Sequence, residues 1–94
     1  MVISVRLIGA LRHISGKKDI EVPFMKSITV KDLIYEISEQ APQLKNTFCN
    51  QELNEPRSNA LILVNGVEIS ALKGYETLLN NGDEVVFIPV VHGG

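Results

Sequence analysis

The chain has 94 residues, 45% of them hydrophobic, and a formal net charge of −2 from nine basic and eleven acidic side chains. This size and composition fit one globular domain over residues 1–94, and the absence of a basic run disfavours nucleic acid as a partner. No apolar stretch approaches the ~20 residues that span a bilayer, and the N-terminus lacks the basic start of a signal peptide. A single cysteine, Cys49, forms no internal disulfide and suits a reducing compartment. We therefore expect a cytoplasmic protein with no membrane partner.

The first part of the chain predicts a β-hairpin. Apolar and polar residues alternate over residues 2–8 and again over 19–22, as in strands with one buried face. Pro23 lacks the N–H that a continuing ladder needs, so we expect the second strand to be short and to lie at a sheet edge. The residues between the strands, 10–18, are expected to form a loop, which makes this a hairpin with a long turn.

A helix is predicted from residue 30 to residue 41. Thr29 can cap the backbone N–H three residues on, and Asp32 can bond back to it, as in a capping box. Pro42 ends the helix, because a residue that precedes proline is pushed out of the α region. Apolar residues at helical spacing form one stripe that has to pack on the sheet: Val30, Leu33, Ile34, Ile37 and Ala41.

The segment after this helix is expected to contain a short docked turn and then an insertion in the compact fold. Leu44 and Phe48 predict a further turn that docks beside the helix. Polar residues then dominate positions 49–59, which predicts an exposed connection.

The last third predicts a second hairpin, a crossover and a final strand. Residues 60–64 are apolar at every position, and Asn65-Gly66 is the favoured signal for a type I′ hairpin to a partner strand over 67–69. The chain then crosses over through residues 70–79 with a short helical turn. Asn81-Gly82-Asp83 turns into the final strand, residues 84–88.

The strands 61–64 and 85–88 are apolar on both faces, and the helix can cover only one of them. The other face is covered either by the connection around Leu53 or by a partner, and we favour a partner because that connection is so polar. We expect the helix-facing core to contain Leu61, Leu63, Val85 and Phe87, or their neighbours of opposite parity, since both sets are apolar. Contiguous exposed apolar surface usually marks a binding site. The other set is therefore the candidate partner-binding surface: Ile62, Val64, Val86 and Ile88.

No motif indicates an active site within the chain itself. The only histidines, His13 and His92, and the single Cys49 make no recognisable metal-binding spacing. Free cysteine usually behaves as a small apolar side chain, so Cys49 is expected to be inert. We expect no bound metal or cofactor, and a carrier or binding protein in place of an enzyme.

The C-terminal end is the candidate reactive site. The chain closes with Val90-Val91-His92-Gly93-Gly94, directly after the final strand. Glycine has no Cβ, so Gly93 and Gly94 can thread a slot too narrow for side chains and present the carboxylate of Gly94. We interpret residues 90–94 as a flexible tail aimed by a rigid strand.

The order of elements, the Asn65-Gly66 hairpin, the turn from Asn81 to Val85 and the His92-Gly93-Gly94 end together resemble the β-grasp, ubiquitin-like sulfur carriers. The resemblance covers the full length. It is strongest to the small subunit of molybdopterin synthase and to its archaeal relatives, which act as small modifier proteins, and the His-Gly-Gly end is also similar to that of the eukaryotic ubiquitin-related modifier. It implies an α+β fold with a mixed sheet of about five strands and one main helix packed on one face.

The same resemblance implies a role. An adenylating, E1-like partner would use ATP and Mg²⁺ to activate Gly94, and sulfur transfer would convert it to a thiocarboxylate. The acceptor would be a pterin precursor on the large subunit of molybdopterin synthase, which makes the chain the small subunit of that complex. Two alternatives use the same activated end: sulfur donation for tRNA thiolation, and attachment as a modifier through Gly94 to lysines of target proteins. The third alternative is an interaction module whose diglycine has no function.

The tail departs from the family in one respect. Its Pro89-Val90-Val91-His92 stretch differs from the Pro-Pro-Val-Ala-Gly-Gly end of many bacterial molybdopterin small subunits. The resemblance therefore leaves the identity of the sulfur acceptor open.

Overall fold

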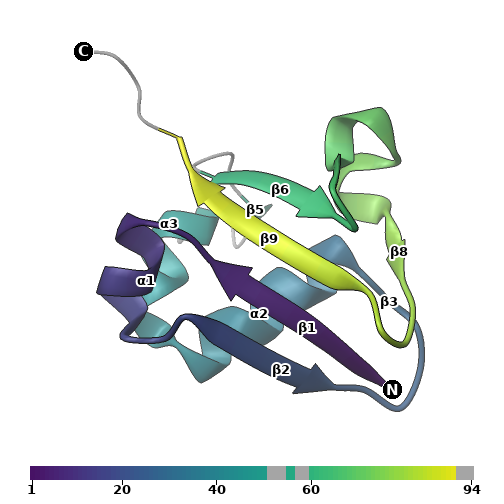
Figure 1. The fold of residues 1–94 in the computed structure, drawn as a ribbon, viewed down its shortest axis with the longest axis horizontal. Helices are drawn as coiled ribbons and strands as arrows, with labels where there is room; N and C mark the ends of the chain where they lie inside the picture. Colours follow the sequence, from purple (N-terminus) through teal and green to yellow (C-terminus); the bar gives the residue numbers. More distant parts are fainter. Residues whose placement is uncertain (51–54, 57–59, 91–94) are drawn as a thin grey trace.

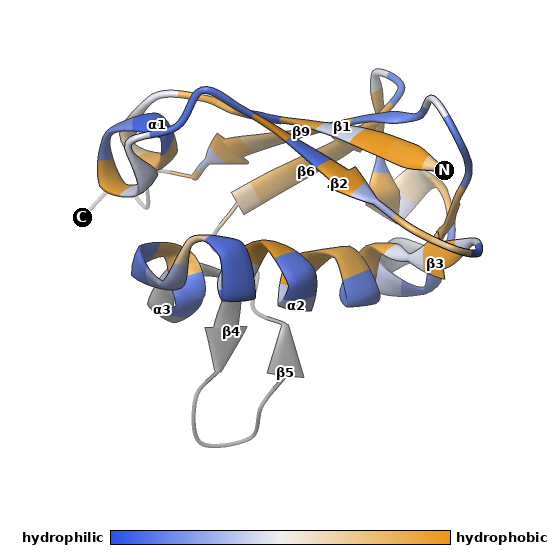
Figure 2. Cartoon of the chain, turned by 90° about the horizontal axis from the view of Figure 1, so that it is seen from below, coloured by the Kyte–Doolittle hydropathy of each residue, from blue (hydrophilic) through white to orange (hydrophobic). Residues whose placement is uncertain are grey.

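The computed structural model describes residues 1–50, 55–56 and 60–90 of the chain. They form a sheet of five strands with one main helix, α2, as a separate layer against one face (Figures 1 and 2). The strand order is β2-β1-β9-β6-β7, with β1 and β9 parallel and the other neighbours antiparallel. The bounds are β1 Val2–Leu7, β2 Asp19–Pro23, β6 Ala60–Val64, β7 Val67–Glu68 and β9 Glu84–Pro89. This confirms the predicted mixed sheet with one helix on one face.

The hairpin of β1 and β2 is as predicted, with β2 at the edge of the sheet, but its connection is not a loop. The chain forms a six-residue helix, α1 Ala10–Ser15, between two glycines with positive φ, Gly9 and Gly16. The N–H of Gly16 donates to the carbonyl of Arg12 at 2.9 Å, and Leu11 is buried. The loop prediction for residues 10–18 was wrong for residues 10–15, which form a helix with Leu11 and Ser15 buried and Gly16 as its C-cap.

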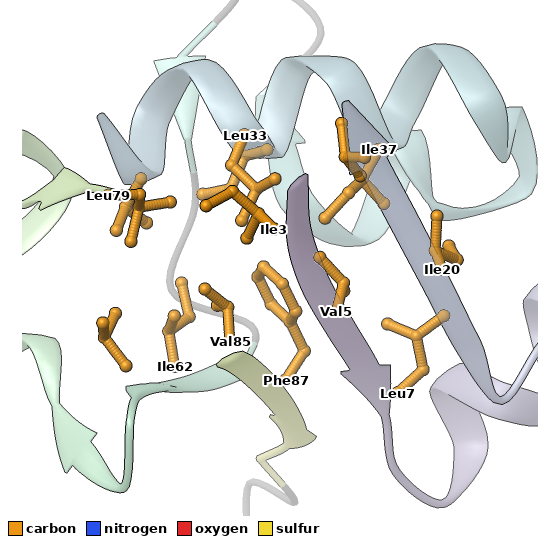
Figure 3. Close-up of a cluster of buried hydrophobic side chains, with 14 of the residues drawn as sticks. Ile3, Val5, Leu7, Ile20, Leu33, Ile37, Ile62, Leu79, Val85 and Phe87 are labelled. Carbon is orange, nitrogen blue, oxygen red and sulfur yellow. The ribbon is translucent and has the colours of Figure 1, made fainter. Parts of the chain in front are cut away.

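The main helix, α2 Val30–Gln40, begins where the sequence predicts and ends one residue before the predicted end, with Ala41 as its C-cap. Its first turn carries the capping box: the N–H of Asp32 donates to Thr29 Oγ1 at 3.2 Å, and the N–H of Thr29 donates to Asp32 Oδ2 at 3.1 Å. Leu33 and Ile37 point from α2 toward the sheet (Figure 3), and neither is exposed to solvent. Each such side chain contributes about 1.5–3 kcal/mol to stability by its burial. The 3-10 helix η1 Pro42–Leu44 and the short helix α3 Lys45–Phe48 follow.

Four short strands form two further antiparallel pairs that the sequence did not predict. β3 Ile28–Thr29 pairs with β8 Leu78–Leu79, and β4 Cys49–Asn50 pairs with β5 Glu55–Pro56. The latter pair lies within the expected exposed connection, whose remaining residues, 51–54 and 57–59, lie outside the described part of the chain. The crossover contains two 3-10 helices, η2 Ile69–Ala71 and η3 Gly74–Glu76, where one helical turn was expected.

The Asn65-Gly66 turn is a type I′ hairpin, as predicted. Asn65 and Gly66 have φ values of 49° and 84°, and Val64 pairs with Val67 across the turn. The Asn65 side chain also reaches the neighbouring turn: its Nδ2 donates to Asp83 Oδ1, and its Oδ1 accepts from the N–H of Glu84, both at 3.0 Å. These bonds fix the start of β9 against the end of β6.

The ladder between β6 and β9 decides which residues face the helix. Ile62 lies opposite Phe87 and Val64 opposite Val85, and cross-strand partners share one face of a sheet. All four side chains are in the core, between 0% and 7% exposed, and Figure 3 shows three of them, Ile62, Val85 and Phe87, beneath α2.

The sequence-based assignment was therefore half right. Val85 and Phe87 are core residues, as expected, whereas Leu61 and Leu63 are not. Ile62 and Val64 are wrong as partner-binding residues, because they are buried under α2. The observed register, with Ile62 opposite Phe87, does not allow Leu61 and Leu63 to share a face with Val85 and Phe87.

Candidate functional site

The strand that leads to the C-terminal tail is held from both sides. β9 lies between β1 and β6, so its backbone is paired along both edges (Figure 1). The pairing reaches its last residue: Pro89 lies opposite Ala60, and the N–H of Ile8 donates to the carbonyl of Phe87 at 3.1 Å. Phe87 is fully buried, whereas Val90, three residues on, is 41% exposed. The chain thus passes from a fixed core position to the surface within three residues.

Gly9 lies against the point where the tail leaves. A Cβ added at Gly9 would meet Pro89 Cγ at 3.4 Å, and the backbone of Gly9 has φ 58° and ψ −128°. This conformation is open to glycine and strongly disfavoured for residues with a side chain. Gly9 therefore lets the turn from β1 into α1 fold close beside Pro89.

A patch of apolar side chains lies on the sheet face opposite α2. The register places Leu61 opposite Ile88 and Leu63 opposite Val86, on the face away from the core. Leu61 is 39% exposed, and the other three are half-buried. We call these four residues the outer patch. Val86 and Ile88 were predicted for such a surface, and Leu61 and Leu63 replace Ile62 and Val64.

A groove runs beside the outer patch along β6. Its volume is about 310 Å³, and its lining includes Leu61, Ile69, Tyr75 and Val90. β7 pairs only with Leu63 and Val64, so the β7-side edge of the first part of β6 borders this groove. The groove therefore connects the outer patch to the base of the tail.

Most of the predicted tail lies outside the described residues. Gly94, Gly93, His92 and Val91 are not described, and Val90 is the last residue that is. The structure brings Val90 close to the outer patch and leaves the roles of the other four as predictions.

The remaining candidates for chemistry are separate from this site or lack a described side chain. His13 is exposed on α1, and Cys49 starts β4. Within the described residues, no three His, Cys, Asp or Glu side chains form a group able to hold a metal ion. No helix of that part is long and apolar enough to cross a membrane.

Sequence reasoning missed Gly9 and the helix that follows it. The pattern that indicates α1 is present: Leu11 and Ile14 are three residues apart, and Gly16 occupies the position just past the helix end where glycine is favoured. Gly9 is favoured by its own backbone conformation, φ 58° with ψ −128°, and no local pattern in the sequence indicates that conformation.

Comparison with known proteins assigns the chain to a family. The sequence model of the ThiS family matches residues 5–94. A search of curated proteins found no significant match.

Solved structures of similar shape span almost the whole chain. Small archaeal modifier protein 1 from Methanosarcina acetivorans is 28% identical, with a TM-score of 0.85, over 99% of this chain and 96% of that one. The HVO 2177 protein from Haloferax volcanii is also 28% identical, with a TM-score of 0.82, over 100% of this chain and 87% of that one. A chain in the complex of subunits 1 and 2 of the molybdopterin-converting factor from Helicobacter pylori is 20% identical, with a TM-score of 0.62, over 100% of both. The fold is the β-grasp, and the chain belongs to the ThiS family of ubiquitin-like proteins.

Proposed function

We propose that this chain is a sulfur carrier whose C-terminal carboxylate, on Gly94, is the chemical site. The observation that supports this most is that the family match includes Gly93 and Gly94, while β9 is paired with β1 as far as Phe87 and with β6 as far as Pro89. A fixed strand followed by five residues suits delivery of a terminus into another protein. Fully extended, residues 90–94 reach at most roughly 17 Å, at about 3.3–3.6 Å per residue.

The chemistry takes place in a partner that uses ATP and Mg²⁺. A carboxylate oxygen of Gly94 attacks the α-phosphate of ATP, which forms an acyl-adenylate and releases pyrophosphate. Sulfide then attacks the acyl carbon and displaces AMP, which leaves a thiocarboxylate on Gly94. The chain supplies the electrophile and the binding surfaces, and the partner supplies the catalytic groups.

The outer patch is the proposed docking surface for that partner. Its side chains are apolar, and one of them, Leu61, lines the groove along β6 together with Val90. A partner that covers the patch would hold the base of the tail while residues 91–94 enter its slot. For sulfur delivery, we propose the large subunit of a molybdopterin synthase as the next partner, by analogy with the two-subunit complex from Helicobacter pylori.

Protein modification is the second candidate function. The 28% identity to small archaeal modifier protein 1 favours it. A lysine amine of a target protein would replace sulfide as the nucleophile and form an isopeptide bond with Gly94.

Intact-mass analysis tests the proposal. The chain is incubated with a cognate activating enzyme, ATP, Mg²⁺ and sulfide, with a reaction lacking ATP as the control. The expected result is an ATP-dependent mass gain of one sulfur-for-oxygen exchange, located on the C-terminal peptide. C-terminal peptides of this chain joined through Gly94 to lysines of other proteins would favour modification, and an unchanged mass with no adducts would exclude both functions for that enzyme.

A further inference from the structure

A group of cationic side chains lies at the end of the sheet from which the tail leaves. Arg12 is on α1, and Lys17 and Lys18 form the connection from α1 to β2. All three side chains are exposed. We call Arg12, Lys17 and Lys18 the basic rim. From Arg6 to Lys18 the chain contains no acidic residue.

Backbone hydrogen bonds hold the basic rim beside the last residues of β9. The N–H of Leu7 donates to the carbonyl of Lys18 at 2.9 Å, and the N–H of the next residue, Ile8, donates to Phe87 at 3.1 Å. Lys18 and Phe87 are therefore bonded to adjacent residues, Leu7 at the end of β1 and Ile8 just after it. Figures 1 and 2 both show α1 at the end of the sheet where β9 ends.

Ser15 fixes the rim locally. Its Oγ accepts from the N–H of Lys17 and donates to the carbonyl of Lys17 or of Arg12. Ser15 is buried, so this turn is part of the folded core. The backbone that carries the cations is therefore held in one position. The nearest acidic residue along the chain, Asp19, is paired with Arg6 at 3.4 Å.

The basic rim is positively charged, whereas the rest of the chain carries a net negative charge. The whole chain has a formal net charge of −2, so subtracting the three cations of the rim leaves −5 for the remaining residues. A local positive surface on an acidic protein steers and orients association with a negative surface.

The proposal rests on the proposed function and concerns how the tail finds its slot. The tail reaches at most roughly 17 Å, so when Gly94 is deep in a slot, the slot entrance must come close to Pro89. The partner surface around that entrance then faces the basic rim. We propose that the basic rim docks against a border of acidic side chains around the slot of the activating enzyme.

A nucleic acid fits the rim less well. Phosphate-backbone binding normally draws on many cations, and single-stranded binding adds aromatic stacking. The basic rim has three cations and no aromatic residue, and the acidic remainder of the chain would repel a polyphosphate. The observations therefore favour an acidic protein surface.

A matched pair of charge-reversal variants tests the rim. Lys17→Glu/Lys18→Glu reverses two rim lysines. Lys26→Glu/Lys31→Glu makes the same change in net charge at two surface lysines away from the tail: Lys26 lies between β2 and β3, and Lys31 is in the first turn of α2. The dissociation constant for the activating enzyme and the rate of ATP–pyrophosphate exchange are measured for both variants and the wild type, at low salt and near 1 M salt, where the screening length falls to about 3 Å. Circular dichroism melting verifies that both variants are folded.

The expected result is a dissociation constant at least about tenfold higher for the rim variant at low salt, with most of that difference lost at high salt. The dissociation constant of the control variant should stay within about twofold of the wild-type value. If the two variants raise the dissociation constant equally, or neither raises it, the rim proposal is overturned. Exchange by the wild type would still uphold the proposed function in that case. Binding that depends on the rim without any exchange would uphold the rim and overturn the function, and neither binding nor exchange would overturn both. Salt-sensitive binding of bulk tRNA that only the rim variant loses, with enzyme binding unchanged, would assign the rim to RNA and overturn the proposal.

Discussion

Ile62 lies directly opposite Phe87 in the β6–β9 ladder, and both side chains are buried beneath α2, at 3% and 0% exposed (Figure 3). This pairing determines the two faces of the central strands. It places Val64 and Val85 in the same core and turns Leu61 and Ile88 outward. The surface offered to a partner and the core that supports it are thus set by one register.

The first prediction concerns the core. Phe87→Ala should lower the free energy of unfolding by about 3–5 kcal/mol, because it leaves a cavity between β9 and α2. Val86→Ala, one residue away on the outer face, should cost no more than about 1 kcal/mol. Chemical denaturation of both variants measures the difference. Equal losses for the two would contradict the assigned register.

The second prediction concerns the outer patch. Leu61→Glu should leave the melting temperature nearly unchanged, because Leu61 is 39% exposed, yet weaken binding to the activating enzyme at least about tenfold, or 1.4 kcal/mol. Leu78→Glu is the control, since Leu78 is 61% exposed on β8, outside the patch. Titration calorimetry with the activating enzyme gives both affinities. If Leu78→Glu weakens binding as much as Leu61→Glu, the docking surface lies elsewhere.

Sequence patterns correctly predicted the elements that are determined by residues close together in the chain. The Thr29–Asp32 capping box, the stop before Pro42 and the Asn65-Gly66 turn each involve residues within a few positions of one another, and all three are present. The short pair β3–β8 joins residues fifty positions apart, and only two residues on each side take part. Such pairing leaves too weak a pattern in the sequence to be predicted.

The orientation of the β6 side chains, toward or away from α2, shows why the candidate site was only partly predicted. Residues 60–64 are apolar at every position, so alternation cannot indicate which side chains face the helix. The answer depends on the partner strand: once Phe87 is in the core, its partner Ile62 must be there too. The tail itself was identified from its composition and position, which require no long-range contact.

The third prediction compares two glycines with positive φ. Gly9→Ala should destabilise the fold by about 1–3 kcal/mol, because φ 58° with ψ −128° is a conformation nearly restricted to glycine. Gly16 has φ 73° and ψ 10°, the left-handed region that asparagine tolerates, and a Cβ there meets nothing within 4 Å. Gly16→Asn should therefore cost less than about 1 kcal/mol.

Thermal unfolding of Gly9→Ala, Gly9→Asn and Gly16→Asn distinguishes the two positions. Asparagine should be tolerated at Gly16 and not at Gly9. Equal stability of Gly9→Asn and Gly16→Asn would show that the turn beside Pro89 does not require glycine.

The tail can be tested without disturbing the fold, because the described core ends at β9. Gly93→Val adds a β-branched side chain, which restricts the backbone and would collide with a slot shaped for glycine. We expect it to lose activation while its melting temperature matches the wild type. Val2→Ala is the control, since Val2 is exposed at the start of β1, whose opposite end pairs with Phe87. Normal activation of Gly93→Val would exclude a narrow slot.

The central claim is that the carboxylate of the last residue is the group that reacts. Deleting Gly94, or adding one residue after it, moves the reactive carbon by about 3.3–3.6 Å, and a misplacement of only about 1 Å can cost on the order of a hundredfold in rate. The most direct test is ATP–pyrophosphate exchange by the activating enzyme with the wild-type chain and with the Gly94 deletion. The account predicts exchange with the wild type and none above background with the deletion; exchange at the wild-type rate with Gly94 deleted would contradict it and leave the chain as an interaction module.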